Sequence, residues 1–117
     1  MSGGGSGNRR WHRIEPASKI RPGEVLRFTV AGHELAVGRT REGRYFAVDD
    51  ACPHAGGSLA EGLVEGETLI CPIHGFAYHV REGRGLDDDA PLRVHPVRLR
   101  EQEDVLEVEL GADEGSG

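Results

Sequence analysis

The sequence predicts an all-β fold, an antiparallel β-sandwich or barrel. Short segments of the 117-residue chain carry apolar residues at alternate positions, which is the period of a half-buried strand. Polar turns separate these segments at short intervals, and 18 of the residues are glycine. No window shows the three- and four-residue spacing of an amphipathic helix, and the segment SLAEGL has room for one helical turn at most. Several short strands divided by turns are typical of sandwiches and barrels.

The strands can be placed in chain order from this alternation. The segment VLRFTV at 25–30 puts Leu26, Phe28 and Val30 on one face, and a turn that contains Gly32 follows it. Residues 55–67 are expected to hold a turn and a short strand. Further strands are expected at 34–39, 45–50, 68–71, 76–80, 94–100 and 105–110.

The last predicted hairpin shows the alternation most clearly. Its two strands flank the polar turn EQED, and Pro96 suits a strand start or an edge, because proline cannot donate to a neighbouring strand. In the final strand Glu107 and Glu109 are expected to face outward. The alternating residues Leu106, Val108 and Leu110 are expected to face the core.

The length suits one domain with one core. We expect the folded domain to span 10–110, with flexible Gly-rich tails at 1–9 and 111–117, native or added. Aromatic residues make up 5% of the chain, so the core is small, and small cores often depend on a metal or a covalent link.

The charge is negative and unevenly distributed. The formal net charge of -6 excludes a general nucleic-acid binder. Residues 1–50 carry nine basic and six acidic side chains, whereas residues 51–117 carry five basic and fourteen acidic ones. The acidic half either forms an ordinary solvated surface or steers a basic partner.

No apolar run reaches the length of a signal peptide or a membrane span, so we expect a soluble, cytoplasmic protein without membrane contacts. In the cytoplasm two cysteines favour metal binding or redox chemistry over a structural disulfide.

Each of the two cysteines begins a short motif at the end of a predicted strand. Cys52 and His54 form C-x-H, and sixteen residues later Cys71 and His74 form C-x-x-H. Two thiolates and two imidazoles can hold a tetrahedral zinc ion or a two-iron cluster. The C-x-H spacing is tight for a loop that wraps a single ion. A two-iron cluster differs, because each loop can give its Cys to one iron and its His to the other and so bridge the length of the cluster.

The segments CPHAGGSLAEG and CPIHGFAYHVREGRG resemble the Rieske 2Fe-2S domain. The resemblance extends upstream through GRYFAVDDACPH and downstream into APLRVHPVRL and VLEVEL, and covers roughly residues 10–110. It implies a Rieske-like antiparallel β-sandwich with a small cluster-binding subdomain. This subdomain would consist of two loops, at about 51–58 and 71–78.

The resemblance also implies the site residues of one Rieske-type 2Fe-2S cluster. Cys52 and Cys71 would ligate one iron through sulfur, and His54 and His74 would ligate the other through a ring nitrogen near the surface. Four further positions would surround the cluster. Three glycines, Gly56, Gly57 and Gly75, would let backbone N–H groups approach its sulfides, and Pro91 would belong to a shielding loop or to an ordinary turn.

Departures from the family pattern indicate the subclass. Quinol-oxidising Rieske proteins carry a disulfide at the positions of Gly57 and Ile73, so this chain resembles the soluble ferredoxin type. Phe76 stands where high-potential sites keep a serine hydroxyl, and Tyr78 stands at the family's tyrosine. Tyr78 is then either a hydrogen-bond donor to sulfur or a plain core residue. Losing one donor predicts a potential in the lower part of the Rieske range.

The resemblance implies a monomeric one-electron carrier, not an enzyme on its own. It would take electrons from a flavin-dependent reductase and pass them to a terminal oxygenase or a similar enzyme. Two alternatives stay open: the small subunit of an NAD(P)H-dependent nitrite reductase, and a zinc-stabilised binding module. The remaining histidines are expected outside the site, with His12, His33 and His95 at the surface and His79 on the face opposite Tyr78.

Overall fold

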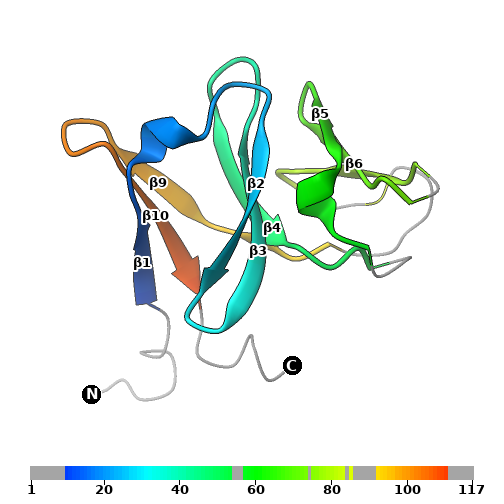
Figure 1. Cartoon of the computed structure of the whole chain (residues 1–117), viewed down its shortest axis with the longest axis horizontal. Helices are drawn as coiled ribbons and strands as arrows, with labels where there is room; N and C mark the ends of the chain where they lie inside the picture. Colours follow the sequence, from blue (N-terminus) through cyan, green and yellow to red (C-terminus); the bar gives the residue numbers. More distant parts are fainter. Residues whose placement is uncertain (1–9, 54–56, 74, 84, 86–91, 111–117) are drawn as a thin grey trace.

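Three antiparallel sheets make up the computed structural model, which describes residues 10–53, 57–73, 75–83, 85 and 92–110 (Figure 1). The predicted all-β class is confirmed. The expected tails at 1–9 and 111–117 lie outside the described residues. The strands are β1 (Arg10–Ile14), β2 (Val25–Val30), β3 (His33–Arg39), β4 (Tyr45–Asp49), β5 (Leu63–Glu65), β6 (Thr68–Ile70), β7 (Ala77–His79), β8 (Val94–His95), β9 (Val97–Arg100) and β10 (Val105–Leu110).

The first sheet has the strand order β1-β10-β9. The apolar side chains of β10 face the core as expected, but Glu107 does not face open solvent and is only 8% exposed. The guanidinium of Arg98 forms an ion pair with Glu107 and lies 4.0 Å from the ring centre of Trp11, so it covers this outer face. Glu107 therefore lies on the outer face of the sheet as expected, but it is covered by Arg98 and is not open to solvent.

The second sheet, with the order β2-β3-β4-β8, lies between the other two and is buried on both faces. Leu35 and Val37 pack toward the first sheet, in a core that also holds Leu106. Ala36 and Val48 pack toward the third sheet, in a separate core. The consecutive residues Leu35, Ala36 and Val37 are therefore all buried, although neighbours in a strand point in opposite directions.

The third sheet, β5-β6-β7, stands at the opposite end of the molecule from the first (Figure 1). Its core contains Leu69 and Tyr78 together with both cysteines, Cys52 and Cys71. The strands predicted at 68–71 and 76–80 are present with shorter bounds. The core beside this sheet therefore holds the two candidate sulfur ligands.

Pro96 divides the segment that was predicted as one strand at 94–100. β8 pairs with β4 in the second sheet and β9 pairs with β10 in the first, so the chain changes sheets at the proline. His95 was expected at the surface but is 2% exposed, and its Nε2 lies 2.8 Å from Oδ1 of Asp49. That expectation was wrong, because β8 turns His95 inward beside β4.

Among the described residues, two 3-10 helices accompany the strands, η2 (Ala17–Lys19) and η3 (Leu59–Glu61). The second is the single turn expected in SLAEGL, and Leu59 anchors it in the core of the third sheet. In the part of the chain that the structure describes, no helix is long and apolar enough to cross a membrane.

Candidate metal centre

Each cysteine begins a six-residue loop that is closed by the same backbone hydrogen bond. The N–H of Cys52 donates to the carbonyl of Gly57 at 2.8 Å, and the N–H of Cys71 donates to the carbonyl of Phe76 at 2.7 Å. The residues just outside each loop also pair. Ala51 bridges Ser58, and Ile70 pairs with Ala77. The two motifs are therefore presented by equivalent hairpin ends.

The two thiols lie together in a dry environment. Cys52 is 2% exposed and Cys71 is fully buried. Burial raises the pKa of the Cys71 thiol, the backbone N–H of Ile73 lowers it in part, and the neighbouring Cys52 thiol raises it again. Two thiolates in such a place repel each other and need a cation between or beside them. The described half of the site therefore fits a metal centre.

Tyr78 contacts the site from β7. Its hydroxyl oxygen lies 3.2 Å from the sulfur of Cys52, and its side chain is 1% exposed. The next residue, His79, points to the other face of the sheet as expected, where its Nε2 lies 3.7 Å from Oε1 of Glu67. The polar end of Tyr78 is thus directed at sulfur and not at solvent.

Gly57 and Ile73, the two positions where the Rieske resemblance led us to compare a disulfide, lie against each other. A Cβ atom placed on Gly57 would be 2.5 Å from Cδ1 of Ile73 and 3.8 Å from the sulfur of Cys71. The two loops therefore meet at these residues. Without cysteines there, packing of Ile73 over the bare glycine backbone takes the place of a covalent link.

Asp50 is a site residue that sequence reasoning missed. Its side chain is buried at the end of β4, and its Oδ1 accepts hydrogen bonds from Ser58 and Ala60, which lie just beyond the first loop. The only signal in the sequence is an acidic residue two positions before Cys52. Charge alone does not distinguish such a residue from a solvated one.

Several predicted site residues lie outside the described part of the chain: His54, Gly56, His74 and Pro91. Among the described residues no cluster of three or more His, Cys, Asp or Glu side chains could hold a metal. Gly75 is described. It is exposed and adopts a φ of 72°, a conformation that favours glycine in the turn of the second loop.

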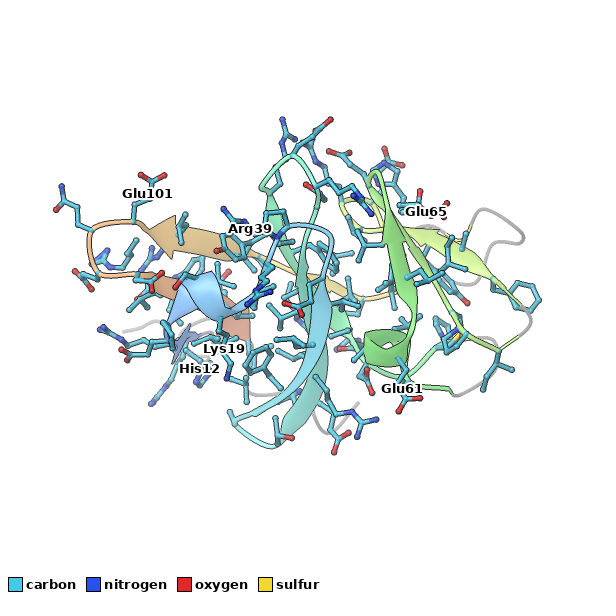
Figure 2. The ribbon with its side chains drawn as sticks, turned by 45° about the horizontal axis from the view of Figure 1, so that its top comes forward. His12, Lys19, Arg39, Glu61, Glu65 and Glu101 are labelled. Atoms are coloured by element: carbon cyan, nitrogen blue, oxygen red, sulfur yellow. The ribbon has the colours of Figure 1, made fainter. Side chains whose placement is uncertain are left out.

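Apolar side chains are exposed at this end of the molecule. Leu63 on β5 is 64% exposed and Ile73 in the second loop is 40% exposed. Figure 2 shows Glu61 and Glu65 on the third-sheet side and Glu101 at the opposite end. Exposed apolar and acidic side chains therefore both occur on the third-sheet side of the molecule.

Comparison with known proteins identifies a family. The model of the Rieske [2Fe-2S] domain matches residues 10–98. Ferredoxin CarAc of Metapseudomonas resinovorans is 34% identical over 99 residues, which cover 82% of this chain and 92% of that ferredoxin. Cholesterol 7-desaturase nvd of Xenopus laevis is 40% identical over 75 residues, which cover 63% of this chain and 16% of the desaturase. The chain thus spans about a sixth of the length of such desaturases.

Solved structures show the same fold. A chain in the complex of reduced oxygenase and oxidised ferredoxin of carbazole 1,9a-dioxygenase matches with a TM-score of 0.72 and 32% identity, covering 83% of this chain and 99% of that one. The small subunit of an NADH-dependent nitrite reductase from Mycobacterium tuberculosis matches with a TM-score of 0.81 at 22% identity. The match covers 89% of this chain and 97% of that subunit. At that identity the second match concerns the fold alone.

Proposed function

Because the chain belongs to the Rieske [2Fe-2S] domain family, whose cofactor is one 2Fe-2S cluster, we propose that it works as a one-electron carrier. The observation that supports this most directly is the pair of equivalent loops, each beginning at a buried cysteine and each containing one histidine. When bound, the cluster accepts and releases a single electron. The chain's task is to hold it, to set its potential and to present it to partners.

We assign the ligands from the loop motifs. Cys52 and Cys71 would hold one iron in the buried interior, and His54 and His74 would hold the other. The contact between the two buried cysteines fits a site whose positive charge comes from iron. The hydroxyl of Tyr78 would donate to the sulfur of Cys52 once that sulfur is a thiolate.

Partners would dock at the third-sheet end. The exposed side chains of Leu63 and Ile73 provide apolar contact, and Glu61 and Glu65 add negative charge beside them. The carbazole 1,9a-dioxygenase structure contains an oxygenase in complex with a ferredoxin, which supports a terminal oxygenase as acceptor. We propose a flavin-dependent reductase as donor, and a monomeric carrier in the cytoplasm that is not an enzyme by itself.

A nitrite reductase small subunit is the second candidate. The TM-score of 0.81 to such a subunit supports it at the level of the fold. The identity of 34% to a ferredoxin over nearly its whole length favours the carrier. A stable complex with a large sirohaem-containing subunit would decide for the nitrite reductase.

The experiment is a redox assay on the purified protein. We expect iron and acid-labile sulfide in equal amounts, and a titration curve with the slope of a one-electron couple. We also expect that a flavin-dependent reductase reduces the protein and that a Rieske oxygenase reoxidises it. A colourless zinc protein, or a reduced protein that no oxygenase reoxidises, would contradict the proposal.

A further inference from the structure

We propose that Asp50 and Arg27 form a charge pair at the base of the first loop that fixes the loop and lowers the reduction potential. The inference rests on the cluster assignment proposed above. Asp50 would act as a positioning residue, because it holds the segment that carries Cys52 and His54. It would also act through its charge, because it lies inside the protein close to the cysteines.

The contacts of the Asp50 carboxylate identify its charged form. Oδ1 accepts a hydrogen bond from the Ser58 hydroxyl at 2.9 Å and from the Ala60 N–H at 2.9 Å. Oδ2 lies 3.3 Å from Nε of Arg27. Two of the three partners can only donate, and the third is placed to donate, so a negatively charged acceptor fits all of them.

The backbone N–H and the backbone carbonyl of Asp50 both form hydrogen bonds that hold this residue in place. Its N–H donates to the carbonyl of Glu34 on β3 at 3.0 Å, and its carbonyl accepts from the N–H of Leu59 at 2.8 Å. Backbone hydrogen bonds therefore connect Asp50, which precedes the loop, both to Leu59, which follows the loop, and to the central sheet. A loop closed in this way keeps its ligands in one geometry.

Asp50 lies near both cysteines. It is two residues before Cys52, so the two Cα atoms lie within about 7 Å of each other. Its partner Ser58 follows Gly57, and a Cβ placed on Gly57 would be 3.8 Å from the sulfur of Cys71. The backbone of Asp50 therefore lies close to the first loop, and its partner Ser58 follows the glycine at which the two loops meet.

Asp50 and Arg27 differ in burial, so solvent screens their electric fields to different extents. The side chain of Asp50 is 7% exposed, whereas that of Arg27 is 47% exposed. Solvent and salt screen the field of Arg27 more than that of Asp50. The pair therefore presents a net negative potential to the loop. Reduction adds a negative charge at the site, so this potential should favour the oxidised form.

The test compares the potentials of two variants of the cluster-loaded protein by voltammetry. Asp50→Asn keeps an oxygen that can accept from Ser58 but removes the charge. We expect its reduction potential to rise by at least about 28 mV. For a one-electron couple this corresponds to a threefold increase in the ratio of reduced to oxidised protein. Arg27→Gln leaves Asp50 less compensated, so its potential should fall, by a smaller amount and more at low salt.

Matched controls lie at the far end of the molecule. Asp104 also accepts hydrogen bonds from a serine, through Oδ1 from the N–H and through Oδ2 from the hydroxyl of Ser18, at 2.9 Å and 2.7 Å. Asp104→Asn makes the same chemical change as Asp50→Asn, and Arg13→Gln makes the same change as Arg27→Gln. We expect both controls to keep the wild-type potential.

The opposite signs separate charge from simple loosening of the loop. Loosening of the loop would shift the potentials of both variants in the same direction, and that result would overturn the proposal. A potential shift in Asp50→Asn no larger than the shift in Asp104→Asn would also overturn it. If Asp50→Asn does not retain the cluster, the salt dependence of Arg27→Gln decides: a fall in potential that is larger at low salt supports the proposal, and no fall or a fall that does not depend on salt overturns it. Failure of the cluster assignment would already show as a missing EPR signal in the wild type.

Discussion

The hydroxyl oxygen of Tyr78 lies 3.2 Å from the sulfur of Cys52 and connects β7 to the first loop. Because Tyr78 is almost fully buried, water cannot replace this hydroxyl if it is removed. A hydrogen bond to a ligand sulfur stabilises the more negative, reduced state of an iron–sulfur site. The contact therefore has a direct consequence for the potential.

Replacing Tyr78 with Phe should lower the reduction potential by tens of mV, where about 59 mV is a tenfold change in equilibrium for one electron. Tyr45→Phe is the matched control, because its hydroxyl donates to the carbonyl of Ala17 in the other core, at 3.1 Å. The control should lose about 1 kcal/mol of stability and keep its potential. Equal potentials in all three proteins would mean that Tyr78 only packs.

Two glycines near the site should differ sharply in their tolerance of alanine. At Gly62 the added Cβ would lie 2.0 Å from the carbonyl oxygen of Ile70, a backbone atom that cannot move alone. At Gly57 the 2.5 Å contact is with the end of the exposed Ile73 side chain, which can rotate. Gly62→Ala should destabilise by about 2 kcal/mol or more, and Gly57→Ala by under about 1 kcal/mol. Thermal unfolding measures both, and equal losses would refute the steric argument.

The ion pair of Arg98 and Glu107 should make stability depend on pH. The hydrogen bond from Arg98 holds the pKa of Glu107 below its ordinary value. The stabilisation is therefore complete above the unfolded value of about 4.3 and is lost as the pH falls through the lower, folded value. Urea unfolding should show Glu107→Gln less stable than wild type at neutral pH, with the difference vanishing in acid. Glu101→Gln, at an exposed turn, should match the wild type throughout.

Negative charge in the acidic half of the chain, residues 51–117, should speed the encounter with a reductase. Asp87, Asp88 and Asp89 lie outside the described residues and follow the second loop in sequence, and we expect them to act in this way. Neutralising these three should slow electron transfer at low salt and have little effect at high salt. A double variant, Glu101→Gln with Glu103→Gln, removes charge at the end of the molecule opposite the third sheet and should leave the rate unchanged. A rate that does not respond to ionic strength would contradict this steering.

The strand pattern of the sequence predicted most of the fold but not how its sheets divide. Alternation located the strands because it reports which side chains share a face. It could not show that β3 is buried on both faces, since that depends on a third sheet that packs from the other side. Pro96 was assigned to a strand start or edge, and the change of sheet there also buries His95.

The site was predictable where its chemistry is carried by spacing. Cys52 and Cys71 lie at strand ends, as the strand pattern predicted. For Tyr78 the sequence left two alternatives, a donor to sulfur or a core residue, and its hydroxyl oxygen lies 3.2 Å from the sulfur of Cys52. The roles of His54 and His74 stay predictions. The environment of Asp50 was not predictable, because its carboxylate pairs with Arg27 on β2, which is distant in the sequence.

The most direct test of the account is the EPR spectrum of the reduced protein. Ligation by two cysteines and two histidines predicts the low average g value that distinguishes such clusters from those with four cysteines. His74→Ala should abolish this signal and lower the unfolding temperature, because cluster binding and folding are linked. An average g value typical of four-cysteine ligation, or no signal from an iron-replete sample, would contradict the account.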